Sequence, residues 1–171
     1  QMLKELVPSL SRVGILTTPH NEVNRLTANV IGAAGDQLGL QLQTFDAASM
    51  QEIEPAFDRM VKAGMQAAIL AQGGLAFQAR HIIPKLALSR GLPLCAYSRE
   101  TFEHGALLSY AADHVEMCRR SAVFADKILK GANPGDIPVE QPTKLELLVN
   151  LRAAKALSLT VPAHIQQIAS E

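Results

Sequence analysis

The sequence predicts an α/β fold built on a Rossmann-like, doubly wound sheet that is mainly parallel. Short apolar runs of strand length alternate along the chain with longer segments of helical periodicity, and Gly or Pro residues separate them. Parallel neighbours require crossover connections, which place helices on both faces of the sheet. A chain of 171 residues is long enough for one such domain, or for one domain and a piece of another.

The strands are predicted from short apolar runs that are bounded by turn residues. The first run, residues 12–17, lies between Pro8 and Pro19, and its continuous apolar character is typical of a buried parallel strand. Five further strands are expected at residues 40–45, 67–71, 93–97, 106–110 and 145–149.

Two helices are predicted from Pro and Gly at their ends. Pro19 suits the first turn of a helix that ends at Gly39. The apolar face of this helix is expected to contain Val23, Leu26, Val30, Ala34 and Leu38. A second helix is expected over residues 75–89, with a kink at Pro84.

Two more helices are predicted to begin with capping boxes, in which Ser49 pairs with Glu52 and Asp113 with Glu116. The first of these helices is expected to bury a stripe formed by Ile53, Phe57, Met60 and Val61. The second is expected to carry Val115, Cys118, Ala122, Ala125 and Leu129 on one face.

The C-terminal residues 138–171 are predicted to stand apart from a ligand-binding lobe at residues 1–137. A link that contains two prolines leads to one strand, 145–149, and one short helix, 151–157, which are too few elements for a core of their own. We therefore expect this tail to belong to a sheet elsewhere. Its unpaired edge would favour a homodimer through the tail.

The composition excludes several classes of partner. The chain has 16 basic and 16 acidic residues and no run of either sign, so no nucleic acid or charged membrane surface is expected as a partner. No apolar run approaches the length of a membrane span, and the N-terminus lacks the pattern of a signal sequence. Residues 2–6 look like the end of a helix, which indicates a fragment.

Ligands of open parallel sheets bind beyond the carboxyl ends of the strands. In this sequence the loops at those ends are expected at residues 17–20, 46–49, 72–74, 98–100 and 110–113. Gly73 and Gly74 form either a close backbone approach to a ligand or a simple turn, since no nucleotide-binding glycine motif surrounds them.

Three larger side chains at strand ends are candidates for direct ligand contact. Arg99 either binds a ligand carboxylate with both nitrogens or pairs with Glu100, Glu103 or a helix end. Tyr97 and Tyr110 are placed where they can stack on a ligand ring.

Catalytic and cofactor motifs are lacking, so we expect no catalytic residue, no cofactor and no metal. The histidines are scattered along the chain at His20, His81, His104, His114 and His164. Ser98 has no neighbouring base. Cys95 and Cys118 lack metal-ligand spacing and are interpreted as buried thiols, although a disulfide between them stays open.

Several stretches carry a further signal, which is a resemblance to a known family. They are residues 7–9, 12–16, 105–110, 125–132 and 138–151, and they include the motifs Asp126-Lys127-Ile128-Leu129-Lys130-Gly131 and Glu140-Gln141-Pro142-Thr143-Lys144. In these stretches the chain resembles ABC transporter substrate-binding proteins, in the uncharacterised group that is similar to tryptophan-binding protein. The resemblance extends from about residue 6 to residue 162.

The resemblance implies a type I periplasmic binding fold, in which two Rossmann-like lobes close on a small molecule. This chain then corresponds to the C-terminal lobe with a return segment that completes the other lobe. The ligand-binding residues implied are Thr17, Thr18, Gln72, Gly73, Tyr97, Ser98, Arg99, Ser109 and Tyr110. The hinge implied is Glu140, Gln141, Pro142 and Thr143. Thr18-Pro19 and Gly105-Ala106 depart from the family pattern and leave the ligand open.

The function implied is the solute-binding component of an ABC importer, in the periplasm or otherwise outside the cytoplasm, with a lipid anchor as an option. Its ligand is expected to be an amino acid or another carboxylate, delivered to a membrane permease. The alternative is the ligand-sensing domain of a transcription regulator or receptor. A hydrolase-type enzyme is less expected, because the nucleophile and base it needs are not found.

Overall fold

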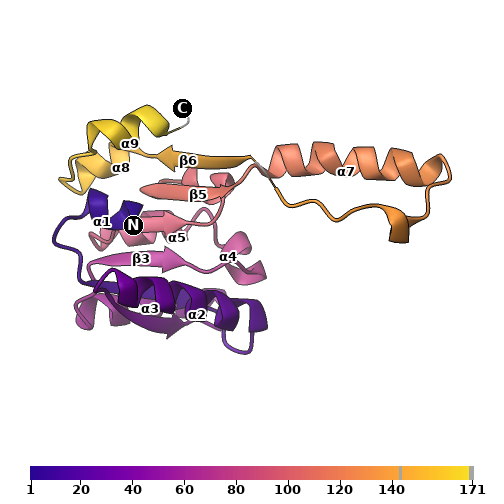
Figure 1. Ribbon diagram of the computed structural model, residues 1–171. Coiled ribbons are helices and arrows are strands. Elements are labelled where there is room, and N and C mark those ends of the chain that lie inside the picture. The colour runs from indigo at the N-terminus through magenta and orange to yellow at the C-terminus, as the bar shows by residue number, and fades with distance from the viewer. Residues whose placement is uncertain (143, 170–171) are drawn as a thin grey trace.

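The computed structural model describes residues 1–142 and 144–169, which are built around one six-stranded sheet (Figure 1). The strands lie in the order β2-β1-β3-β4-β5-β6, and each neighbouring pair is parallel except β5 with β6, which is antiparallel. Their bounds are β1 Arg12–Thr17, β2 Gln41–Asp46, β3 Ala67–Leu70, β4 Leu94–Ala96, β5 Leu108–Ala112 and β6 Leu145–Val149. The predicted α/β class with a mainly parallel sheet is confirmed.

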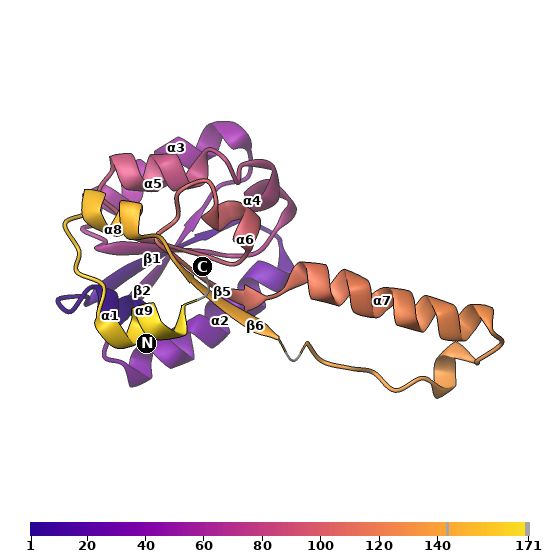
Figure 2. The ribbon, with the colours of Figure 1, turned by 90° about the horizontal axis from the view of Figure 1, so that it is seen from above.

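Helices cover both faces of this sheet (Figure 2). Their bounds are α1 Met2–Leu6, α2 Glu22–Gln37, α3 Met50–Lys62, α4 Gly74–Gln78, α5 Ile83–Ser89, α6 Arg99–Phe102, α7 His114–Leu129, α8 Leu151–Ala156 and α9 Ala163–Ile168, with a short 3-10 turn at Pro134–Asp136. Helices α3, α4 and α5 lie on one face, and α1, α2, α8 and α9 on the other. None of the helices in the described ranges combines the length and the apolar character that crossing a bilayer requires.

Two clusters of buried apolar side chains hold these layers together. One joins α3, α4 and α5 to the sheet and includes the fully buried Phe57 and Met60. The other joins α1, α8 and α9 to the opposite face and includes Leu6. The predicted stripe of α3 is confirmed at Ile53, Phe57 and Met60, whereas Val61 is exposed.

Helix α2 packs through a different face from the one predicted. Val23, Leu26 and Val30 are exposed, and the buried residues of the helix are Asn24 and Gly35. A Cβ atom at Gly35 would lie 1.8 Å from Leu42 Cδ1, so this glycine is needed for the close approach of the helix to β2. The helix therefore contacts the sheet through small and polar residues, which a hydrophobic stripe cannot reveal.

Three predicted helix ends differ from the structure. Pro19 lies before α2, whose N-cap is Asn21. Ser49 makes no side-chain capping bond, although the Glu52 carboxylate accepts a hydrogen bond from the backbone N–H of Ala48 at 2.9 Å. The helix expected over 75–89 is divided into α4 and α5, with Pro84 in the first turn of α5, where a proline costs no helical hydrogen bond.

The C-terminal strand lies in the same sheet as the rest of the chain, which corrects the predicted placement of the tail. Strand β6 pairs with β5, with Leu108 opposite Val149 and Ala112 opposite Leu145. It occupies the edge that β5 would otherwise leave unpaired. Because Leu147 and Leu148 are buried there, the reason for expecting a dimer through the tail is removed.

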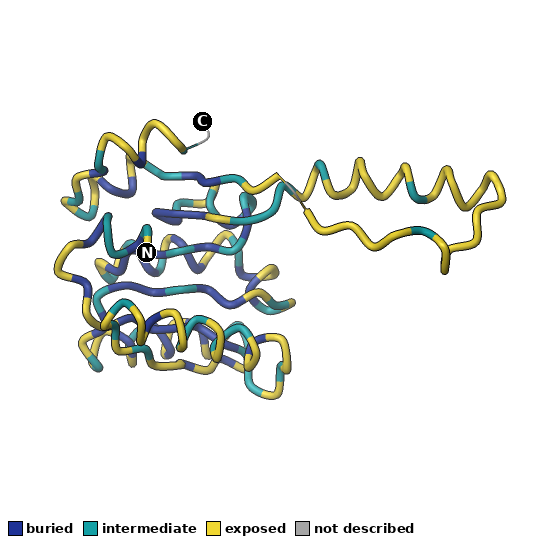
Figure 3. The backbone as a smooth tube through the Cα atoms, viewed as in Figure 1, coloured by how far each residue is buried: buried dark blue, intermediate teal, exposed yellow. Residues whose placement is uncertain are grey.

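The segment between β5 and β6 does not pack on the sheet. Helix α7 and the segment that returns from it, together residues 114–142, project away from the sheet, and we call them the arm (Figure 1). None of the residues of α7 is buried (Figure 3). The predicted apolar face of this helix is therefore exposed, and the helix does not cover the sheet as expected of a crossover helix.

Candidate ligand-binding site

The loops that follow β1, β3 and β4 meet at the edge of the sheet from which the arm leaves, and they enclose two adjacent hollows. The first hollow has a volume of about 510 Å³ and is lined by Asn21, Val23, Gln72, Gly73, Gly74, Phe77, Tyr97, Ser98, Glu100 and His114. The second has a volume of about 650 Å³ and is lined by Thr17, Thr18, Pro19, His20, Asn21, Glu22, Asn24, Arg25, Ala28, Asn29, Thr44 and Asp46. Both lie where open parallel sheets bind their ligands.

Asn24 holds the loops after β1 and β3 together. Its side-chain oxygen accepts a hydrogen bond from the backbone N–H of Thr18 at 2.7 Å, and its side-chain nitrogen donates to the Gln72 carbonyl at 2.6 Å. The residue is 2% exposed. The sequence analysis missed it, although an Asn in the first turns of a helix is unfavourable for the helix itself and so is a usable signal.

Ser98 and Tyr97 form one wall of the first hollow. Ser98 is buried and is the N-cap of α6, because its hydroxyl oxygen accepts a hydrogen bond from the backbone N–H of Thr101 at 3.3 Å. Burial raises the pKa of Tyr97, and the negative charge of Glu100 adds to this increase. The serine thus supports the loop, while the tyrosine ring borders the hollow.

Glu100 adds a carboxylate to the same hollow. Its Oε2 atom is buried, and no described residue is a hydrogen-bond partner for it. Nδ1 of His114, the first residue of the arm, lies 3.6 Å from Oε1. From the sequence, Glu100 was expected only as a possible partner of Arg99.

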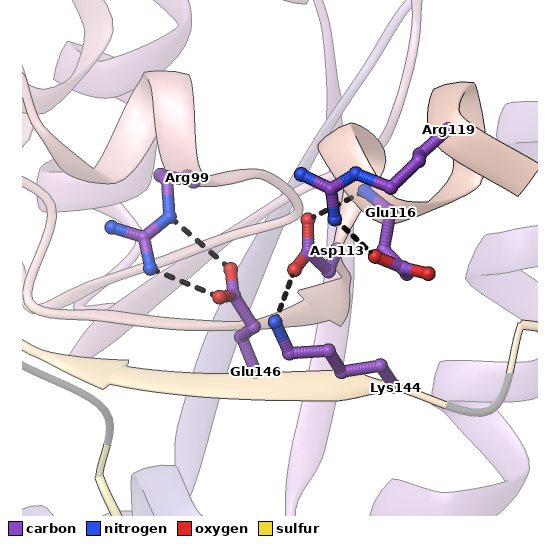
Figure 4. A network of polar contacts seen from close by, with 6 residues as sticks. All are labelled: Arg99, Asp113, Glu116, Arg119, Lys144 and Glu146. Carbon is purple, nitrogen blue, oxygen red and sulfur yellow. Dashed lines mark hydrogen bonds and ion pairs between the residues drawn. The ribbon is translucent and has the colours of Figure 1, made fainter.

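Arg99 is paired within the protein. Its Nε and Nη2 atoms lie 3.2 and 3.1 Å from the two carboxylate oxygens of Glu146 on β6 (Figure 4). Arg99 lines neither hollow. Its partner is none of those considered from the sequence, since the pairing depends on β6 lying beside β5.

A second ion pair lies at the base of the arm. Lys144 Nζ donates to Asp113 Oδ2 at 2.6 Å, and Asp113 Oδ1 accepts from the backbone N–H of Glu116 at 3.0 Å, which confirms the predicted N-cap (Figure 4). The pKa of Asp113 is lowered by Lys144 and then by this capping bond. The start of the arm is thereby fixed to the end of β6.

The remaining predicted site residues lie in different environments. Thr18, with Gln72, Gly73, Tyr97 and Ser98, borders one or the other hollow. Thr17 borders the second hollow as well, whereas Ser109 and Tyr110 border neither. Thr17 is buried and its hydroxyl donates to Asp46 Oδ1 at 2.6 Å. Ser109 is buried in β5, and Tyr110 is half exposed outside both hollows.

The predicted hinge residues lie on the returning segment of the arm. Glu140 accepts hydrogen bonds from Nε and Nη2 of Arg120 at 2.6 and 2.7 Å. Gln141 and Pro142 border a groove of about 500 Å³ between this segment and α7. Thr143 lies outside the described residues.

The two hollows offer different polar groups. The first has amides, hydroxyls, the Glu100 carboxylate, the His114 imidazole and the rings of Tyr97 and Phe77. The second adds charged side chains, which are Glu22, Arg25 and Asp46. In residues 1–142 and 144–169 no three His, Cys, Asp or Glu side chains are grouped so as to hold a metal ion. Cys95 and Cys118 are both free, and Cys118 is exposed rather than buried as expected.

The sequence and the fold were compared with those of known proteins. A curated relative, the tyrosine-binding protein of Clostridioides difficile (strain R20291), is 19% identical over 159 residues, which make up 93% of this chain and 46% of that protein. An ABC domain from Streptococcus pneumonia in complex with L-Trp has a TM-score of 0.88 at 21% identity, over 99% of this chain and 58% of that chain. A conserved domain protein from Vibrio cholerae has a TM-score of 0.89 at 19% identity, over 98% of this chain and 56% of that chain.

These structures share the fold of this chain, which spans about half the length of each of them. The family model described as ABC transporter substrate binding protein matches residues 1–171. Since that match includes every residue, the resemblance seen in the sequence is confirmed. The chain belongs to the ABC transporter substrate binding protein family.

Proposed function

We propose that this chain forms one ligand-binding lobe of a solute-binding protein for an ABC importer, and that an amino acid-like solute binds in the first hollow. The observation that carries the proposal is the hollow itself, which has about 510 Å³ beside the carboxyl ends of β3 and β4. Small-molecule sites have volumes of roughly 300–1,000 Å³ and combine apolar walls with a few polar groups. The names of two similar proteins, which refer to tyrosine and to L-Trp, favour an amino acid.

The exposed arm supports a second lobe. Val115 and Leu129, which lie on the predicted apolar face of α7, are 64% and 87% exposed, and an apolar helix face of this kind is usually covered by a partner. The family members compared above are about twice as long as this chain. We infer that the arm packs in a second lobe and that the solute is held between the two.

A hinge at residues 140–143 fits this arrangement. The Arg120–Glu140 pair lies on the arm side of it, and the Asp113–Lys144 pair lies on the sheet side. Each pair links an outgoing to a returning segment, and the two pairs bracket the proposed hinge.

The partner and the location follow from the family rather than from geometry. The protein would pass its solute to a membrane permease, act outside the cytoplasm and catalyse no reaction. Small-molecule binding is the part of this proposal that the present fold supports directly.

Isothermal titration of the full-length protein against the twenty common L-amino acids tests the proposal. We expect binding of at least one of them, and we expect Tyr97→Ala to weaken it by roughly tenfold or more, since removing an aromatic wall typically costs more than 1 kcal/mol. Tyr110→Ala is the matched control, because this tyrosine lies outside both hollows. Failure to bind any of the twenty, or equal losses in the two variants, would contradict the proposal.

A further inference from the structure

Glu100 supplies the carboxylate among the described residues that line the first hollow. The residue lies in the first turn of α6. Its Oε2 atom is buried and has no hydrogen-bond partner among the described residues, but the side chain as a whole is 42% exposed. A solute in the hollow can therefore contact the carboxylate group from its accessible side.

The carboxyl group of Glu100 carries a negative charge at neutral pH. Burial by itself raises its pKa, but its own backbone N–H, the Ser98 hydroxyl and His114 outweigh this effect and hold the pKa below its usual value. Nδ1 of His114 is 3.6 Å from Oε1, which is too far for a good hydrogen bond. The charge is therefore present and only weakly compensated.

The described residues that line the hollow include no permanent cation, although Arg80 lies nearby, with its guanidinium carbon 4.4 Å from the centre of the Phe77 ring. Arg99, the neighbour of Glu100 in sequence, is bound through two nitrogens to Glu146 and lines neither hollow. Closure of a second lobe over the hollow would remove water from this half-exposed carboxylate, and a charge that loses its water is stabilised by an opposite charge, so the arrangement favours a cationic group on the solute.

We propose that Glu100 anchors a positively charged ammonium group of the solute, with the ring of Tyr97 beside the solute's apolar part. This inference rests on the proposed function and narrows it, because it makes the solute a primary amine such as an α-amino acid. It differs from one of the two roles considered for Arg99 from the sequence, in which that residue binds a carboxylate of the ligand.

The test compares each L-amino acid that the full-length protein binds with its deaminated analogue, for example L-tyrosine with 3-(4-hydroxyphenyl)propanoate. Titrations are made with the wild type, Glu100→Gln and Glu103→Gln. Glu103 is the matched control, since it lies at the other end of the same helix, is exposed and lines neither hollow. Circular dichroism of each variant confirms that it is folded.

We expect the wild type to prefer the amino acid over its analogue. Glu100→Gln is expected to weaken amino acid binding by about 10- to 100-fold, the range for loss of a charge-assisted hydrogen bond, and to leave analogue binding within about threefold. Glu103→Gln should change neither.

Two outcomes separate this inference from the proposed function. If the wild type binds an amino acid and Glu100→Gln binds it equally well, or loses affinity for both ligands alike, the role of Glu100 is wrong while solute binding stands. If the wild type binds no amino acid at all, the proposed function itself fails and the ammonium anchor fails with it.

Discussion

Helix α3 and helix α7 have similar amphipathic sequences but opposite surroundings. The stripe of α3 is buried against the sheet, with Phe57 and Met60 both 0% exposed. The stripe of α7 is in solvent, and Leu129 at its end is 87% exposed. An apolar stripe therefore shows that a helix has a buried face in its complete context, but it does not show which part of the protein buries that face.

The same comparison distinguishes a lobe that has a buried core from an arm whose helix has no buried residue. Around the sheet, two apolar clusters join every layer, and the strands are hydrogen-bonded to one another from β2 to β6. The arm is held mainly by exposed ion pairs, such as Arg120 with Glu140. Exposed ion pairs contribute little to stability, so the arm and the lobe should respond differently to mutation.

The largest difference is expected for truncations of apolar side chains. Phe57→Ala should lower the free energy of unfolding by about 3–5 kcal/mol, because it removes a fully buried ring and leaves a cavity. Leu129→Ala should change it by less than about 0.5 kcal/mol, as for other exposed positions. Urea denaturation followed by circular dichroism measures both. Similar losses at the two positions would show that α7 is packed in this chain after all.

A smaller loss of stability is expected when the hydrogen bonds of Asn24 between the loops after β1 and β3 are removed. Asn24→Ala should cost about 1–3 kcal/mol, since it leaves the Thr18 N–H and the Gln72 carbonyl without their partner. Asn29→Ala, on the exposed side of the same helix, should stay within about 0.5 kcal/mol. If the Thr18 amide exchanges faster in Asn24→Ala but not in Asn29→Ala, the loss of stability arises in the loops that Asn24 joins. A cost at Asn29 as large as that at Asn24 would refute the bridging role.

Features that depend on local pattern were predictable from the sequence. All six strands were placed to within about two residues. The apolar runs of β1 and β3 are typical of buried parallel strands, whereas β2, which is mostly exposed, was placed by the glycine that ends the preceding helix. The Asp113 cap was also predicted, since it requires only residues that are close in sequence. Thr18, Gln72 and Tyr97 were chosen by the rule that ligands bind at strand ends.

Features that depend on distant neighbours were missed. The pairing of β6 with β5 joins segments that are separated in sequence by the whole arm. The residue pattern of 145–149 predicts a strand, but it does not indicate which strand lies beside it. The Arg99–Glu146 pair follows from that pairing, and so it was missed as well. Glu100 becomes a site residue only when α6 turns its first residues toward the loop after β3, which is a property of the packed fold.

The smallest effect on stability should come from removing the arm altogether. Asp113 and Lys144 lie opposite each other at the ends of two antiparallel strands, with the Asp113 N–H donating to the Lys144 carbonyl at 3.1 Å. Replacing residues 114–143 by Asn-Gly would thus join β5 to β6 through a two-residue hairpin, which is the loop length and sequence that such strand pairs favour. Only exposed ion pairs are lost, and the closed loop becomes shorter, so the free energy of unfolding should change by less than about 1 kcal/mol. Urea denaturation and amide chemical shifts measure the result. A loss of several kcal/mol, comparable with that of Phe57→Ala, would mean that the arm is part of the core of this lobe, whereas an unchanged lobe would assign the apolar face of α7 to a partner outside it.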